Sequence, residues 1–334
     1  MSNGKKAHLY TLKAGDIRLC VSSFGAAWTS LTLPASKGGK SDVLLGYSNL
    51  DGYIGDAAYM GATIGRYAGR ISGARFTIEG IEHELGANEP RSCLHGGARG
   101  FGARLWKSEA YEESDGVFVR FELESPDGDG GFPGNLVAAV SYGITKTNEI
   151  VAVYEATCDA PCPINLANHA YFNLSGDGGA SILGHEALIH ASSYVETDGD
   201  LIPTGQLLPV KDGAFDFRAR KPIGRDMGAA PGGYDHCFAI DGDPGDLRLC
   251  AEFRDPASGR AMIVYTTQPG AQFYTGNKLA AVRGKAGAVY GAHSGFCLET
   301  QRFPDSPNRP EFPSCVFGPE RPYVEKSAFA FEIE

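Results

Sequence analysis

Residues 136–159, LVAAVSYGITKTNEIVAVYEATCD, decide the fold class because they predict two strands joined by a tight turn. The runs 136–145 and 149–159 are rich in β-branched and aromatic residues, which favour strands. The residues TKTN, 145–148, lie between the two runs and are typical of a short hairpin connection. Strands joined this closely pair in the antiparallel direction, so this stretch predicts an antiparallel sheet.

Further runs of the same kind predict that strands continue along most of the chain. These runs are residues 17–33, 74–85, 117–125, 247–255 and 260–270. Glu79-Gly80 divides the second run into two halves, and DPASG, 255–259, joins the last two, so we expect consecutive hairpins. Helical periodicity over more than ten residues is absent, and only residues 49–60 are expected to hold a short helix. The sequence therefore predicts an all-β protein, a large sandwich or barrel, with residues 1–334 forming a single domain.

The composition is that of a soluble globular protein and narrows the range of partners. Hydrophobic residues make up 43% of the chain, and no apolar run approaches the roughly 18 residues that a membrane-spanning helix needs. The net charge of −10 argues against a nucleic-acid partner, whose phosphates require clustered Lys and Arg. The eight cysteines form no CxxC pair and are interpreted as thiols rather than disulfides. No apolar segment follows the N-terminal lysines, so we expect a cytoplasmic protein that binds a neutral small molecule, without a membrane or nucleic-acid partner.

The stretch HSGFCLETQRFPDSPN, residues 293–308, places a carboxylate inside a run that otherwise resembles a buried strand. Successive strand residues point to opposite faces, so Phe296, Leu298 and Thr300 share one face while Cys297, Glu299 and Gln301 share the other. A buried carboxylate needs strong partners or a place at the floor of a polar cleft. Glu299 is therefore a candidate functional residue.

A second stretch, CPINLANHAYFNL, residues 162–174, also carries polar groups on a strand pattern. If it is one strand, Asn165, His169, Tyr171 and Asn173 share a face that can bind hydroxyl groups. A single strand histidine is more often a hydrogen-bonded structural residue than a catalytic one, so position alone leaves the role of His169 open.

Three other places supply candidate residues with alternative interpretations. His95 precedes a Gly-Gly pair, where the backbone can approach a ligand or simply turn at the surface. Asp235 and His236 begin an apolar strand and face opposite ways, so they do not ligate one metal together. Arg66 and Arg70 are interpreted from their spacing as surface charges.

No spacing in the sequence is typical of a metal or nucleotide site. The eight histidines include no HExxH or HxH pattern, and CDAPC, 158–162, lacks the second ligand pair of a structural zinc site. GATIGRYAGRI, 61–71, lacks the Gly-Lys-Ser/Thr ending of a phosphate loop. We therefore expect no metal and no cofactor.

Nine segments, in order along the chain, resemble the aldose 1-epimerases, or galactose mutarotases. They are FGAAWTSL (24–31), LLGYSNLDGY (44–53), GATIGRYAGRI (61–71), LHGG (94–97), GFPGNL (131–136), NHAYFNLSG (168–176), GYDH (233–236), QFYTGN (272–277) and HSGFCLETQRFPDSPN (293–308). Together they span nearly the whole chain. The resemblance implies a galactose mutarotase-like super-sandwich, a single large antiparallel β-sandwich with an open cleft for a free sugar and no cofactor. It also implies an enzyme that interconverts the α and β anomers of aldoses such as glucose or galactose, as a monomer or homodimer.

The resemblance also implies roles for individual residues. Glu299 of LETQ matches the general base, His169 of NHAYFN the general acid, and His95 of LHGG a second histidine at the reacting end of the sugar. Positions that hold sugar hydroxyls or orient the catalytic groups are matched by Arg70, Asp235 and Gln272. Members of the family often have Asn at the position of Gly69 and Asp at that of Gly102. The first difference is expected to alter sugar preference, and the second to concern loop structure.

Ring opening of an aldose requires one proton to leave the C1 hydroxyl and one to reach the ring oxygen. With reference pKa values of about 4.3 and 6.5, Glu299 is expected to be ionised at neutral pH and His169 to keep a protonated fraction. Tyr171 or Phe273 is expected to pack against the sugar. An inert carbohydrate-binding domain of the same fold is an alternative, as is a glycoside hydrolase that uses Asp235 and Glu299.

Overall fold

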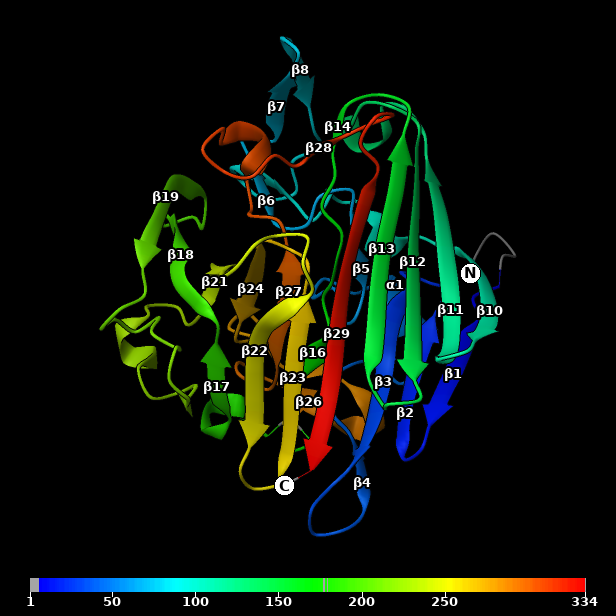
Figure 1. Ribbon diagram of the computed structural model, residues 1–334, viewed down its shortest axis with the longest axis vertical. Coiled ribbons are helices and arrows are strands. Elements are labelled where there is room, and N and C mark those ends of the chain that lie inside the picture. The colour runs from blue at the N-terminus through cyan, green and yellow to red at the C-terminus, as the bar shows by residue number, and fades with distance from the viewer. Residues whose placement is uncertain (1–5, 177, 179, 334) are drawn as a thin grey trace.

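A nine-stranded antiparallel sheet forms one layer of the computed structural model, which describes residues 6–176, 178 and 180–333 (Figure 1). In order across the sheet its strands are β10 (Lys107–Glu113), β11 (Gly116–Ser125), β12 (Leu136–Thr145), β13 (Ile150–Cys158), β29 (Tyr323–Ile333), β23 (Arg260–Thr266), β22 (Arg248–Asp255), β17 (Glu186–Ile189) and β20 (Lys221–Pro222).

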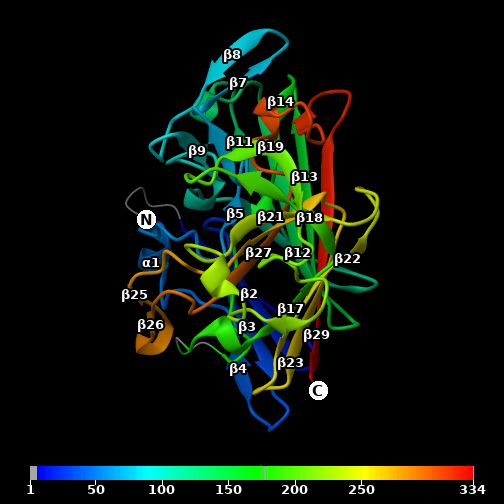
Figure 2. The same ribbon diagram turned by 90° about the vertical axis from the view of Figure 1, so that its left-hand side faces the viewer.

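Two further antiparallel sheets form the second layer. The six-stranded sheet has the order β16 (Tyr171–Phe172), β27 (Phe296–Gln301), β24 (Gly270–Tyr274), β21 (Asp235–Ile240), β18 (Ala191–Thr197) and β19 (Pro203–Pro209). The four-stranded sheet has the order β1 (Leu9–Ala14), β2 (Ile17–Ser22), β3 (Ala27–Pro34) and β4 (Lys40–Asp42). Seen edge-on, the long strands β29, β23 and β22 lie on one side of the molecule (Figure 2). Helix α1 (Leu50–Ile54) and the ribbon of β25 (Val282–Arg283) and β26 (Val289–Tyr290) lie on the other side.

Short two-stranded ribbons connect and cover the main sheets. They are β5 (Thr63–Ile64) with β15 (Ala167–Asn168), β6 (Arg70–Ser72) with β9 (Ser92–Leu94), β7 (Arg75–Ile78) with β8 (Ile81–Glu84), β14 (Cys162–Pro163) with β28 (Val316–Phe317), and β25 (Val282–Arg283) with β26 (Val289–Tyr290). Short 3₁₀ turns occupy Phe101–Ala103, Asp129–Gly131, Ile182–Gly184, Met227–Ala229, Lys285–Gly287 and Ser306–Asn308. Among the described residues, no helix has the length and apolar character needed to cross a membrane.

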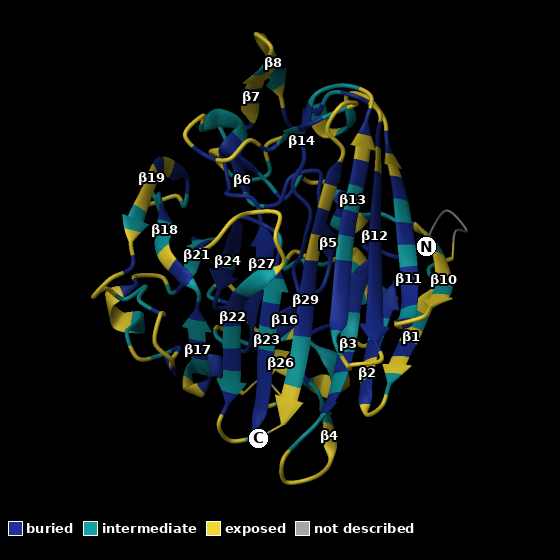
Figure 3. Ribbon diagram, in the orientation of Figure 1, coloured by how far each residue is buried: buried dark blue, intermediate teal, exposed yellow. Residues whose placement is uncertain are grey.

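Aromatic side chains join the two layers into one core. Phe253 of β22 stacks on Phe296 of β27, with ring centroids 4.4 Å apart. Trp28 of β3 meets Tyr142 of β12 and Phe329 of β29 edge-on, at 5.4 and 5.2 Å. The strands of both layers are buried along their central parts, whereas exposed residues gather at the connecting loops (Figure 3). The expected antiparallel β-sandwich is confirmed.

The expected hairpins and the short helix are present. Ile144 pairs with Ile150 across the 145–148 turn, and β22 pairs with β23 across 255–260. Between β7 and β8 the two turn residues Glu79 and Gly80 have φ angles of 51° and 80°, the conformation of a type I′ hairpin. Helix α1 lies within the predicted range 49–60.

The prediction of one strand over residues 162–174 is wrong, because this segment pairs in turn with three different partners. The short strands β14, β15 and β16 pair with β28, β5 and β27. Asn165, between β14 and β15, donates to the carbonyls of Ala68 and Arg302. Asn168, at the end of β15, donates to the carbonyl of Gly61. Side-chain bonds of this kind replace ladder bonds and let the chain change direction.

The interpretation of Arg66 and Arg70 as surface charges is also wrong, since they are only 2% and 7% exposed. Arg66 donates to the carbonyls of Ser125, Pro126 and Pro133 and so holds three loop positions together. A buried guanidinium needs such partners, and spacing along the chain cannot reveal them.

A buried histidine outside the candidate site makes the stability of the fold depend on pH. The Nε2 atom of His185 accepts a hydrogen bond from the Leu174 amide at 3.0 Å, so it is unprotonated. Burial lowers the pKa of His185 to about 4, although the nearby Asp255 partly opposes this. In the unfolded chain the pKa is about 6.5, so only the unfolded state gains a proton between these values. This group therefore destabilises the fold as the pH falls from 6.5 towards 4.

We expect the free energy of unfolding to fall by about 2 kcal/mol between pH 7.5 and pH 5 through His185 alone. Urea unfolding at the two pH values, with His185→Gln beside the wild type, measures this contribution. The other histidines titrate in both proteins, so the difference between the two pH dependences isolates His185. Equal losses in both proteins would contradict the assignment.

Candidate active site

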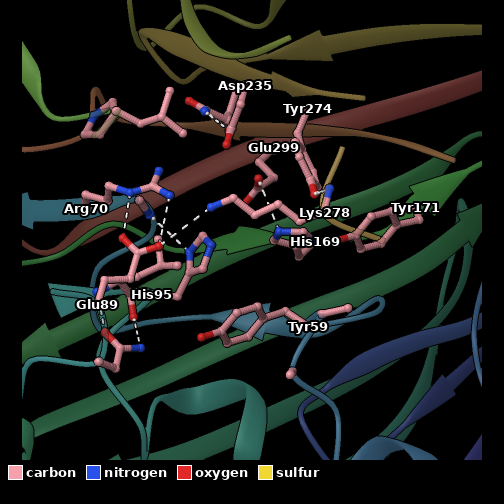
Figure 4. Close-up of a pocket in the computed structure, with 18 of the residues that line it drawn as sticks. Tyr59, Arg70, Glu89, His95, His169, Tyr171, Asp235, Tyr274, Lys278 and Glu299 are labelled. Carbon is pink, nitrogen blue, oxygen red and sulfur yellow. Dashed lines mark hydrogen bonds and ion pairs between the residues drawn. The ribbon is translucent and has the colours of Figure 1, made fainter. Parts of the chain in front are cut away.

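A cavity of about 790 Å³ lies beside the six-stranded sheet and is lined by all six candidate residues. They are Glu299 on β27, Gln272 on β24, Asp235 on β21, Arg70 at the start of β6, His95 directly after β9 and His169 between β15 and β16. Strand pairing brings these distant segments together, because β27, β24 and β21 are neighbours in the sheet. Figure 4 shows the labelled side chains converging on one space.

Glu299 lies at the floor of this cavity, is 2% exposed and has an incompletely satisfied carboxylate. Its Oε1 atom is 3.6 Å from Nε2 of His169, and its Oε2 atom has no hydrogen-bond partner among the described residues. Burial and the charge of Asp235 raise the pKa of Glu299 well above its ordinary value, while Arg70 acts in the opposite direction. The carboxyl group therefore binds a proton more tightly than an ordinary glutamate does.

His169 faces Glu299 and is equally buried, with 5% exposure. Its Nδ1 atom lies 3.5 Å from the thiol of Cys297, which leaves Nε2 directed at the carboxyl group of Glu299 (Figure 4). Burial lowers the pKa of His169 to about 4. The expectation that His169 keeps a protonated fraction at neutral pH is therefore wrong.

Two arrangements place a single proton on the pair formed by Glu299 and His169. The neutral arrangement has a carboxylic acid beside a neutral imidazole, and the ionic arrangement has a carboxylate beside an imidazolium. Removal from water penalises both charges, so burial favours the neutral arrangement. Moving a single proton between two facing groups converts one arrangement into the other.

His95 is held in one tautomer by the backbone. It has a φ of 55° and precedes Gly96, where a Cβ atom would lie 2.1 Å from the carbonyl oxygen of Gly65. The Gly69 amide donates to Nδ1 of His95 at 3.2 Å. Burial and the charges of nearby groups lower the pKa of His95 well below its ordinary value, so the ring is neutral. Its remaining proton is on Nε2, which is thereby a hydrogen-bond donor.

The three ligand atoms of His95, His169 and Glu299 lie within 4.8 Å of one another, a spacing that a divalent metal could bridge. A metal ligand must offer a lone pair, however, and Nε2 of His95 carries a proton while Nδ1 accepts from Gly69. Metal binding would therefore break the Gly69 bond. The hydrogen bonding fits proton chemistry better than metal ligation.

Arg70 is anchored by a residue that the sequence did not single out. Its Nε and one terminal nitrogen donate to the two carboxylate oxygens of Glu89, at 2.8 and 3.1 Å. Burial tends to raise the pKa of Glu89, but its bonds to Arg70 outweigh this and lower it. Lys278 lies 3.9 Å from the same carboxylate. Such a two-point bond fixes the plane of the guanidinium.

Asp235 and Gln272 form a second polar pair at the cavity. The side-chain amide of Gln272 donates to Asp235 at 2.7 Å, while its oxygen has no partner among the described residues. Gln272 is paired with Glu299 across the two strands. The unpaired amide oxygen and the carboxylate can each accept a hydrogen bond from a hydroxyl group.

Three tyrosines surround His169. Tyr171 was expected from the sequence, whereas Tyr59 and Tyr274 were not. The ring centroids of Tyr171, Tyr59 and Tyr274 lie 5.1, 5.9 and 6.3 Å from that of His169. Tyr274 lies two residues after Gln272 on β24, so strand alternation predicts that the two side chains share a face. Tyr59 and Glu89 come from loops, where no periodic pattern marks which residues face a cavity.

The expectation that Phe273 packs against the sugar is wrong. Gln272 and Tyr274 point into the cavity, so the residue between them must point the other way. Phe273 is fully buried in the core, 5.6 Å from Phe253.

Comparisons with known proteins agree on one family. Its sequence profile, described as aldose 1-epimerase, matches residues 8–329. The chain is 41% identical to the galactose mutarotase of Rattus norvegicus, covering 99% of this chain and 96% of that protein. It is 36% identical to the aldose 1-epimerase of Escherichia coli strain K12, covering 99% and 97%. The crystal structure of an aldose epimerase homologue from C. elegans superposes with a TM-score of 0.90 at 28% identity, covering 98% and 99%.

Proposed function

The chain belongs to the aldose 1-epimerase family and is an isomerase that interconverts the α and β anomers of free aldoses, and we propose that Glu299 and His169 carry out its proton transfers. The observation that supports this assignment is the 3.6 Å approach of Glu299 Oε1 to His169 Nε2 inside the cavity. An inert sugar-binding domain has no chemical need for such a pair, so that alternative is not favoured.

In the proposed reaction, the sugar binds with its two anomeric oxygens next to the pair. Glu299, as carboxylate, takes the proton from the C1 hydroxyl, and His169, as imidazolium, delivers a proton to the ring oxygen. The C1 to ring-oxygen bond breaks and C1 becomes an aldehyde. After rotation about the C1–C2 bond, the same groups run these steps in reverse on the opposite face. One proton is therefore sufficient for both half-reactions.

Among the surrounding groups, Arg70 favours the ionic arrangement that ring opening needs. Arg70 lowers the pKa of Glu299, and Glu89 holds that guanidinium in place. His95 donates from Nε2 to a sugar oxygen, while Asp235 and Gln272 accept from hydroxyl groups. Tyr171 supplies an aromatic surface next to His169.

Polarimetry on freshly dissolved α-D-glucose and α-D-galactose tests the proposed function. We expect the wild-type protein to reach the equilibrium rotation much faster than buffer alone. A rate equal to that of buffer on both sugars and on a pentose panel would leave a sugar-binding domain as the better explanation. Release of reducing sugar from glycosides would instead indicate a hydrolase.

The shared proton predicts a broad pH profile with an unusually low acid limb. Activity is lost when a second proton binds to the pair, which occurs near the His169 pKa of about 4. Activity is lost again when the last proton leaves Glu299, whose pKa is raised. We therefore expect kcat/KM to be level above about pH 5 and to fall only where the pH exceeds the raised pKa of Glu299. Initial rates corrected for buffer catalysis measure this, and an acid limb near 6.5 would contradict the shared proton.

We also propose that residues 1–334 act as a single domain in the cytoplasm. The family profile spans most of the chain, and all eight cysteines are free thiols, which supports a reducing compartment.

A further inference from the structure

Gln301 is a buried polar side chain whose hydrogen bonds are missing. It lies on β27 two residues after Glu299, on the same face, and is 1% exposed. Neither its amide nitrogen nor its amide oxygen bonds to a nitrogen or oxygen of the described residues. It approaches the thiol of Cys237, which is a weak partner. A buried amide without partners costs stability, so a group that forms no part of the chain is expected to satisfy it.

Gln301 lines the cavity, and two glycines flank it. Its partner on β24 is Gly270, which has no polar side chain to offer. On the other side is Gly69, where a Cβ atom would lie 3.5 Å from the amide nitrogen of Gln301 and 3.0 Å from Pro304. Gly69, Gln301 and Pro304 all line the cavity. Glycine at 69 therefore places no side chain against the Gln301 amide.

We propose that Gln301 determines sugar specificity by binding two neighbouring hydroxyl groups of the aldose, an inference that rests on the proposed function. A primary amide presents a donor and an acceptor side by side, which matches one hydroxyl that accepts and a neighbour that donates. Residues two apart on a strand are about 6.6 Å apart along it. With Glu299 at C1, this offset places Gln301 across the ring, at the hydroxyls of C3 and C4.

The test replaces Gln301 with methionine, which keeps the length of the side chain and removes both hydrogen-bonding atoms. NMR measures the rate at which the two anomers of equilibrated sugar exchange, through their anomeric protons. Exchange rates at several sugar concentrations give KM and kcat. For D-glucose we expect KM to rise about tenfold while kcat changes less. The reason is that the lost hydrogen bonds stabilise the bound sugar equally in the ground state and in the transition state.

Deoxy sugars identify the hydroxyl groups involved. With 3-deoxy- or 4-deoxy-D-glucose the difference in KM between wild type and Gln301→Met is expected to shrink towards one, since part of the contact is already missing. With 2-deoxy-D-glucose the roughly tenfold difference is expected to persist. The proposal would be overturned if Gln301→Met left KM for D-glucose unchanged. It would also be overturned if the KM difference between the two proteins disappeared with 2-deoxy-D-glucose. An inactive wild type would refute the proposed function itself, so the two failures are distinguishable.

Gln268→Met is the matched control. Gln268 is also fully buried, but it donates to the Tyr323 hydroxyl at 2.7 Å and does not line the cavity. Its replacement is expected to lower Tm and leave KM unchanged, whereas Gln301→Met is expected to keep or raise Tm. A lower Tm with an unchanged KM in Gln301→Met would show a structural role and reject the inference.

Discussion

Replacing Glu299 with glutamine is expected to lower kcat for aldose mutarotation by about 10²–10⁴-fold, or about 3–5 kcal/mol of barrier. The amide keeps the shape of the buried carboxyl group and cannot take the proton from the C1 hydroxyl. Burial raises the pKa of Glu299 and so favours its neutral form, and we therefore expect a neutral amide at this position to preserve the fold and Tm. Polarimetry on α-D-galactose with both proteins measures the loss.

Glu325→Gln is a suitable control for this experiment. Glu325 is a second buried glutamate, 6% exposed, which accepts from Arg302 at 2.6 Å and does not line the cavity. Its loss is expected to lower stability, because it removes the negative charge that Arg302 pairs with while Arg302 keeps its bond to the Ser314 carbonyl, and to change kcat little. If Glu299→Gln keeps wild-type kcat, Glu299 is not the base.

The second large effect is expected for His169→Gln, with a fall in kcat of about 10²–10⁴-fold. Glutamine places an amide near the position of Nε2 but cannot carry a proton to the ring oxygen. His185→Gln is the matched control, because His185 is equally buried and lies outside the cavity lining. That control is expected to shift only the pH dependence of stability.

The double variant Glu299→Gln/His169→Gln distinguishes a shared proton from two independent groups. Groups that act as a unit lose most of their effect with the first substitution, so we expect the double variant to be about as slow as either single one. If the fold-loss of kcat in the double variant equals the product of the two single fold-losses, the groups act separately.

Some features of the protein followed from local patterns in the sequence. Alternation and turn residues predicted the hairpins at 136–159 and 74–85, because strand period and turn chemistry involve residues close together in the chain. The same alternation placed Glu299 and Gln301 on one face of β27. The family resemblance named the six candidate residues, and the sequence offered no means of placing them relative to one another.

Tertiary structure decided the rest, since it depends on contacts between distant segments. Residues 162–174 pair with three separate partners, so their break into short strands was not visible locally. Glu89 and Tyr59 reach the cavity from loops that carry no periodic pattern.

The sequence patterns alone predicted an antiparallel all-β fold, a sandwich or barrel, and the residue types available for proton transfer. They could not determine the protonation of those residues. Burial from all sides moves the pKa of Glu299 up and that of His169 down to about 4, which favours the neutral form of both groups. The cost of removing a charge from water depends on everything packed around it, and only the folded chain brings those groups together.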